Sequence, residues 1–331
     1  MKRCYHTYDK GVKKAMTSIV FMGTPDFSAP ILQSLIDNPA YDVVAVLTQP
    51  DRPVGRKHTL KPTPVKEVAV KANIPVLQPN KLSGSDEMKQ IISLAPDFII
   101  TAAYGQFLPT KLLAAAKMGA INVHASLLPK YRGGAPIHYA VLNGDEKTGV
   151  TIMYMVKEMD AGDIIAQKEL PILSEDNTGT LFDKLSLLGR DLLLSTLPKL
   201  ISGDITPIPQ NIDQVSFSPN IQPNEEVLDF TQPAQVVHNH VRGLFPFPIA
   251  HTTIKGTRTK IQKTHLVDEK TDALPGTVVK KGKHELWLAT GDGQVIAIDE
   301  LQPAGKPKMT ITDYLNGHAN FAEGDQVITY D

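Results

Sequence analysis

The chain has 331 residues, of which 42% are hydrophobic and 21% are charged, and its formal net charge is −1. This length exceeds one typical domain and suits two, and the near-neutral charge excludes a global attraction to nucleic acid or membranes. One cysteine, Cys4, excludes internal disulfide bonds and cysteine-based metal sites, and no apolar run is long enough to span a bilayer. We therefore expect a globular protein of the reducing cytoplasm that does not associate with membranes.

The first 16 residues are polar and have no apolar core, so they do not resemble a signal peptide. We expect a poorly ordered tail over 1–16, and Met16 is a candidate for the true start. A strand over 18–22, a helix over 27–37 and a strand over 43–47 follow. A strand, a helix and a strand at this spacing predict a βαβ unit and hence a parallel sheet. The turn after the first strand lacks the Gly-x-Gly-x-x-Gly pattern, so no nicotinamide cofactor is expected.

The next elements continue the alternation of helices and strands. After a long connection at 49–64, we expect helices over 65–72, 87–94, 111–117 and 137–142 and strands over 74–77, 97–103 and 119–124. A strand over 150–156 and a long amphipathic helix over 180–200 complete this half of the chain. This order predicts a Rossmann-like, mostly parallel α/β domain over 17–204.

The amino-acid composition changes at 205–223, a stretch rich in Pro, Gln, Asn and Ser that we interpret as a linker. A helix over 234–242 then leads into short strands that are separated by glycine and charged turns. We expect these strands at 250–254, 260–265, 276–279, 285–289 and 295–301. Short strands at this spacing predict a small OB-like β-barrel domain over 224–331.

Two polar side chains mark a candidate catalytic site at the end of the strand 119–124. Asn122 and His124 are two residues apart, so both side chains leave the same face of the sheet. A carboxamide and a protonated imidazole are donors that can stabilise the oxyanion of an acyl transfer. The proton that leaves an attacking amine needs a further acceptor, and Asp160, in a turn after the strand 150–156, is our candidate. Glu158 and Asp163 remain alternatives.

Two groups of cations are candidates for phosphate contacts. The segment 49–64 is long, basic and without periodicity, which is typical of a functional loop. The second group is clustered in the predicted barrel, and one-sided clustering of this kind indicates contact with nucleic acid. The candidates are Arg52, Arg56, Lys57 and Lys61 in the first group and Lys255, Arg258, Lys260 and Lys263 in the second.

Several segments together resemble the methionyl-tRNA formyltransferase family over nearly the whole chain from about residue 18. The matching segments are 21–27 (FMGTPDF), 48–53 (TQPDRP), 61–66 (KPTPVK), 103–105 (AYG), 121–129 (INVHASLLP), 131–137 (YRGGAPI), 149–153 (GVTIM), 159–163 (MDAGD), 289–293 (ATGDG) and 301–305 (LQPAG). The Asn-x-His and Ser-Leu-Leu-Pro motifs with the later aspartate are shared by folate-dependent formyltransferases that act on other amines. The QPDRP loop and the second domain favour the tRNA enzyme.

The resemblance implies that the formyl group of 10-formyltetrahydrofolate is transferred to the amine of methionine on initiator tRNA. Asn122, His124 and Asp160 match the catalytic trio of the family, and Arg56 is the expected principal tRNA contact. The residues expected to contact folate are Ser126, Leu127, Leu128 and Pro129, together with Tyr104 and Gly105 in a loop that should flank the site. We expect a monomer and no metal. The alternatives are a formyltransferase for an amino-sugar nucleotide and a non-catalytic tRNA-binding module.

Overall fold

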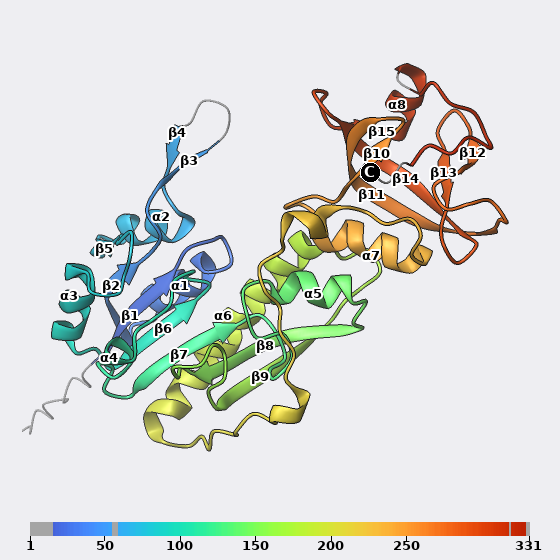
Figure 1. Ribbon diagram of the computed structural model, residues 1–331. Coiled ribbons are helices and arrows are strands. Elements are labelled where there is room, and N and C mark those ends of the chain that lie inside the picture. Colours follow the sequence, from blue (N-terminus) through green and yellow to red (C-terminus); the bar gives the residue numbers. More distant parts are fainter. Residues whose placement is uncertain (1–15, 55–58, 318, 329–331) are drawn as a thin grey trace, which may run out of the picture.

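The computed structural model describes residues 16–54, 59–317 and 319–328, which form two packed domains (Figure 1). The N-terminal domain is built on a seven-stranded sheet of order β5-β2-β1-β6-β7-β8-β9. Its strands are β1 (Thr17–Gly23), β2 (Tyr41–Leu47), β5 (Val76–Leu77), β6 (Phe98–Ala102), β7 (Gly119–His124), β8 (Lys147–Tyr154) and β9 (Ile164–Pro171). The strands from β5 to β7 pair in parallel, and β8 and β9 pair antiparallel. The mostly parallel sheet is confirmed, whereas β9, in which four of the eight residues are exposed, was not predicted.

Helices cover both faces of this sheet, which explains why β1 is a continuous apolar run. Ile19 and Phe21 pack into one hydrophobic core and Val20 and Met22 into the other, all four with 0% exposure. The first core also takes side chains from α1 (Ala29–Ile36), α2 (Pro64–Lys71), α5 (Pro136–Leu142) and α6 (Thr178–Ser202), and the second from α3 (Asp86–Leu94) and α4 (Thr110–Leu113). We predicted a helix over 111–117, and the corresponding helix, α4, ends earlier, at Leu113.

The connection at 49–64 is a β-hairpin and not the irregular loop that the sequence predicted. Its strands are β3 (Arg52–Val54) and β4 (Thr59–Lys61), and it projects away from the sheet (Figure 1). At its base, Asp51 accepts hydrogen bonds from Lys66 at 2.6 Å and from Gln78 at 2.7 Å. The hydrogen bond from Lys66 lowers the pKa of Asp51 below its usual value, so this anchor is ionic at neutral pH.

The C-terminal domain is an antiparallel β structure of strand order β10-β11-β14-β13-β12, with β15 paired to β14. Its elements are α7 (Ala234–Leu244), β10 (His251–Ile254), β11 (Thr257–Lys270), β12 (Val278–Lys281), β13 (Leu286–Ala289), β14 (Gln294–Pro303), β15 (Met309–Thr310) and α8 (Ile311–Gly317). Ile328 bridges to Ile254 in β10, and Gln326 bridges to Thr277 beside β12. The C-terminal segment thus joins the two edge strands and closes the sheet, in agreement with the predicted barrel.

The two domains pack through α5 and α7, which lie next to each other in Figure 1. A Cβ on Gly243 would lie 2.9 Å from the side chain of Leu142, so only glycine permits this close approach. Thr178 donates to the carbonyl oxygen of Gly243 at 2.6 Å, and Tyr139 donates to Glu225 at 2.8 Å. Among the helices of the described segments, none is long and apolar enough to cross a membrane.

Candidate functional site

A cavity of about 830 Å³ opens beside β7, and the three predicted catalytic residues line it. Asn122 and His124 lie on the strand face of Ala120, which packs into the core that α3 and α4 cover. The strand itself ends at His124, and the chain then turns away from the sheet. The side chains of Asn122 and His124 therefore line the cavity and are not packed into the hydrophobic core.

The hydrogen bonds of Asn122 fix the direction of its amide. Thr101, on the neighbouring strand β6, donates its hydroxyl hydrogen to Oδ1 of Asn122 at 2.7 Å. Nδ2 of Asn122 makes no hydrogen bond to any residue that the structure describes. Because Asn122 lines the cavity, its two N–H donors are available to a substrate oxygen.

His124 is 6% exposed and is hydrogen-bonded through one of its ring nitrogens. Nε2 lies 2.9 Å from the carbonyl oxygen of Tyr131. A carbonyl only accepts, so Nε2 carries a proton and donates it. Nδ1 lies 3.8 Å from Oδ2 of Asp160. Nδ1 is therefore the nitrogen that can gain or lose a proton during a reaction.

Asp160 reaches the cavity from the connection between β8 and β9. Its Oδ2 accepts a hydrogen bond from the main-chain N–H of Gly133 at 2.9 Å, and its side chain is 13% exposed. Of the two alternatives, Glu158 lies at the exposed rim and Asp163 does not line the cavity. The carboxylate that faces His124 is thus that of Asp160.

The segment 205–223, which we interpreted as a linker, forms part of the cavity wall. Its main chain bonds to the loop after β7, as Arg132 donates to Ser216 at 2.9 Å and Ala135 donates to Ser218 at 3.0 Å. Phe217 and Asn220 line the cavity. The polar composition of this stretch concealed its role, and the isolated aromatic Phe217 was the one available signal.

Large apolar side chains surround the mouth of the cavity. Phe107, Met159 and Phe217 are 65%, 68% and 68% exposed and all line it. Exposed apolar groups that converge on a cavity indicate a surface that a ligand covers. Deeper inside, Phe182 packs edge-on against Phe27 at 6.5 Å and stands 5.9 Å from the ring of His138.

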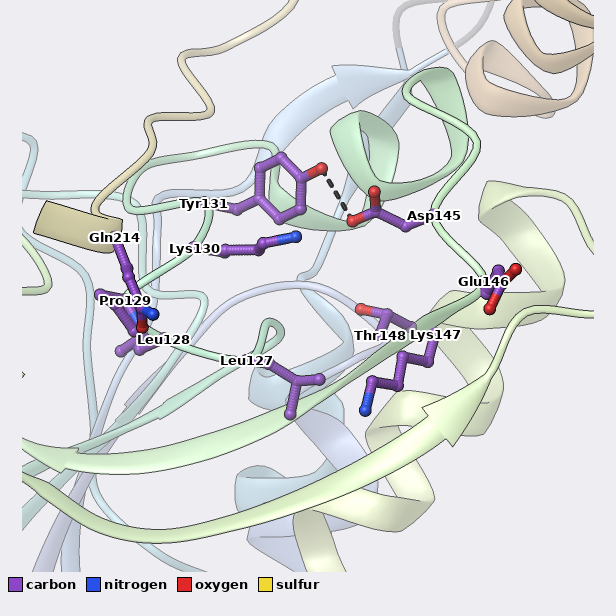
Figure 2. A pocket seen from close by; sticks show the side chains of 10 residues that line it. All are labelled: Leu127, Leu128, Pro129, Lys130, Tyr131, Asp145, Glu146, Lys147, Thr148 and Gln214. Atoms are coloured by element: carbon purple, nitrogen blue, oxygen red, sulfur yellow. Dashed lines mark hydrogen bonds between the residues drawn. The ribbon is translucent and has the colours of Figure 1, made fainter. Parts of the chain in front are cut away.

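The residues Ser126, Leu127, Leu128 and Pro129 do not line this cavity, and their contact with folate stays a prediction. Ser126 is fully buried and donates to the carbonyl oxygen of Lys130 at 2.7 Å. Leu127, Leu128 and Pro129 line a separate cavity of about 600 Å³ (Figure 2). The turn is tied to β8, where the main-chain N–H of Leu128 donates to the hydroxyl of Thr151 at 3.1 Å.

The loop after β6 supplies the other two residues that we expected near folate. Tyr104 and Gly105 both line the larger cavity. The ring of Tyr104 packs into the core under α3, and burial raises the pKa of Tyr104 to about 12. The phenol of Tyr104 is therefore neutral at physiological pH. Residues 155–159 also line the cavity, and the sequence did not predict a ligand-binding role for this stretch as a whole.

The predicted phosphate contacts of the hairpin are partly described. Arg52 and Lys61 are cross-strand partners on β3 and β4, and both are exposed. Arg56 and Lys57 lie outside the described residues. The two placed cations stand at the base of the hairpin and present positive charge to solvent.

The second group of cations lies on β11 and in the turn that precedes it. Lys255 forms an ion pair with Asp325 at 3.6 Å and Arg258 with Glu226 at 4.0 Å. Lys260 and Lys263 make no ion pair with any described residue. This group is therefore partly neutralised, and two of its four charges remain open to phosphate.

The described residues contain no group of three or more His, Cys, Asp or Glu side chains that could hold a metal ion.

Comparison with known proteins agrees with this geometry. Residues 16–197 match the family model described as formyl transferase, and residues 220–319 match the model of the formyl transferase C-terminal domain. Fold and site together define a formyl transferase of two domains. The chain is 63% identical to the methionyl-tRNA formyltransferase of Pediococcus pentosaceus over 96% of this chain and 99% of that protein. It is 65% identical to the methionyl-tRNA formyltransferase of Lactiplantibacillus plantarum, over 95% and 99%. The chain belongs to the methionyl-tRNA formyltransferase family.

A solved structure shares the fold at low sequence identity. The N-formyltransferase from Helicobacter canadensis, solved with folinic acid and dTDP-3-aminofucose, has a TM-score of 0.64 and 21% identity over 87% of this chain and 100% of that one. This similarity concerns the fold alone.

Proposed function

We propose that this chain transfers the formyl group of 10-formyltetrahydrofolate to the free amino group of methionyl-initiator tRNA, which gives N-formylmethionyl-tRNA for the start of translation. The observation that carries the proposal is the meeting of Asn122, His124 and Asp160 in one cavity. Its volume of about 830 Å³ lies in the range of small-molecule sites. The near-full-length likeness to methionyl-tRNA formyltransferases supports the choice of acceptor.

Asn122 and His124 act on the oxygen of the formyl group. When the neutral amine attacks the formyl carbon, this oxygen gains negative charge. Nδ2 of Asn122 and the protonated Nδ1 of His124 donate to it, and one such donor lowers a barrier by about 3–4 kcal/mol. The fixed direction of the Asn122 amide means that little reorganisation is needed at this step.

Asp160 acts on the proton. Its carboxylate stabilises the imidazolium of His124, from which it lies 3.8 Å away. The amine loses one proton as the new C–N bond forms, and the folate nitrogen gains one as its bond to the formyl carbon breaks. We assign the relay of this proton, through water, to Asp160.

The two ends of the cavity suit the two substrates. The lobe lined by Phe27, His138 and Phe182 takes the methionyl side chain, because a thioether makes favourable contacts with aromatic rings. Burial lowers the pKa of His138, so its ring adds no positive charge there at neutral pH. The wall formed by 104–108 and 155–159 is left for the folate.

A direct test compares acceptors in one formylation assay. The purified chain is given 10-formyltetrahydrofolate with methionine-charged initiator tRNA, methionine-charged elongator tRNA or an amino-sugar nucleotide. We expect formylation of the initiator tRNA with a strong preference over both other acceptors. Equal or better use of the amino sugar would replace the proposal with the alternative, and tRNA binding without formyl transfer would leave only a binding module.

Arg56→Ala is expected to weaken the binding of charged initiator tRNA and to reduce the slope of log K against log salt by about one, because one phosphate contact is lost. Fluorescence titration at several salt concentrations measures both quantities. Lys89→Ala is the matched control, since Lys89 is 72% exposed on α3 and already paired with Asp86. An unchanged affinity and slope in Arg56→Ala would remove this residue from the interface.

A further inference from the structure

The side chain of Gln210, in the segment 205–223, bonds both to the turn that contains Asp160 and to Arg132 in the loop after β7. Nε2 of Gln210 donates to the carbonyl oxygens of Asp160 and Gly162, both at 2.8 Å. Oε1 of Gln210 accepts from Nε and Nη2 of Arg132, at 3.0 and 2.7 Å. Both amide hydrogens and the oxygen are therefore used, so the hydrogen-bonding capacity of this carboxamide is filled.

The main chain at Asp160 needs such support. Its φ of 50° lies in the left-handed region, which residues other than glycine adopt only when their surroundings impose it. Gln210 fixes the carbonyl groups on either side of Ala161, and the N–H of Gly133 fixes the carboxylate. Gly133 follows Arg132, so the contact to Arg132 holds that donor beside Asp160.

The partner of Arg132 is neutral, and this leaves the guanidinium charge unopposed. No carboxylate among the described residues lies within 4 Å of it. Arg132 lines the cavity, so its orientation by Gln210 also sets where positive charge faces a substrate.

We infer that Gln210 is a positioning residue for formyl transfer: it holds Asp160 in the one backbone conformation that directs the carboxylate to His124. The inference rests on the proposed function, in which Asp160 relays a proton. Because Gln210 belongs to the segment that leads into the C-terminal domain, the path of that segment determines the geometry of the catalytic centre.

Gln210→Glu tests the donor half of this contact. A glutamate keeps an oxygen for Arg132 but has no N–H for the two carbonyl groups and places negative charge beside them. We expect the turnover of formyl transfer to fall by about 10- to 100-fold, as for a small misplacement of a catalytic group, while KM for folate and for charged tRNA changes by less than about threefold. Gln210→Met, which removes all four hydrogen bonds at similar size, is expected to lower turnover at least as much.

Gln214→Glu is the matched control. Gln214 lies on the same segment, outside the catalytic cavity, and its side chain makes no hydrogen bond to a described residue. It should keep the turnover of the unchanged chain. A similar loss in Gln214→Glu would show a general effect of charge on the segment and would overturn the inference.

A readout without substrate separates this inference from the proposed function. Hydrogen exchange at the amide of Gly133, which is protected by Asp160, should become faster in Gln210→Glu and Gln210→Met but not in Gln214→Glu. Unchanged exchange and unchanged turnover in both Gln210 variants would refute the positioning role. If the unchanged chain does not formylate initiator tRNA, the proposed function fails, and the exchange at Gly133 still decides whether Gln210 holds Asp160.

Discussion

Replacing His124 by alanine is expected to lower the turnover of formyl transfer by about 10²- to 10⁴-fold, the range for loss of a general acid–base group. Affinity for the folate donor should change little, because the imidazole acts on charge that develops only in the transition state. A single-turnover formylation assay, combined with a titration of the donor, measures the two quantities separately.

His284→Ala is a suitable control for this variant. His284 lies in the C-terminal domain, where its Nδ1 is 2.8 Å from the hydroxyl of Thr312. It should retain full turnover. Normal turnover in His124→Ala, or a loss of donor affinity as large as the loss of turnover, would contradict the role that we assign to His124.

Asp160→Asn is the second substitution from which we expect a large effect. An asparagine oxygen can still accept the N–H of Gly133, so the loop should stay in place. The negative charge 3.8 Å from Nδ1 of His124 is lost, and with it the proton acceptor. We expect turnover to fall by about 10²- to 10⁴-fold without a comparable change in the affinity for charged tRNA.

Asp163→Asn makes the same chemical change three residues further along. Asp163 is exposed and does not line the cavity, so this variant should turn over normally. A result in which Asp163→Asn is slow and Asp160→Asn is not would transfer the catalytic role to the alternative that the sequence left open.

The placing of the three candidate residues was only partly predictable from the residues themselves, which left Glu158 and Asp163 open beside Asp160. Asn122 and His124 share a strand face by simple alternation, and Asp160 belongs to a motif that the family resemblance identifies. Their distances were not predictable, since they depend on the path between β8 and β9, and β9 was not predicted from the sequence.

The walls of the cavity were harder to predict than its catalytic groups. The family resemblance implies that the Ser-Leu-Leu-Pro turn contacts folate, and its two leucines line the separate cavity of Figure 2. Two residues after this turn, the carbonyl oxygen of Tyr131 accepts the hydrogen bond from Nε2 of His124. The sequence does not show that a main-chain carbonyl of this loop orients the ring of His124.

Long-range contacts account for the remaining differences. The base of the β3–β4 hairpin is held by Asp51, Lys66 and Gln78, which are up to 27 positions apart. The contact between Gln210 and Asp160 spans 50 positions. Neither contact follows from local periodicity, so both segments looked like unstructured connections.

The most direct test is the turnover of the double variant His124→Ala/Asp160→Asn, measured under single-turnover conditions beside both single variants. If the two side chains act as one unit, the second substitution has little left to remove, and the double variant should be at most about threefold slower than the slower single variant. Losses that multiply in full would mean that the imidazole and the carboxylate work independently, and a shared catalytic site for them would be contradicted.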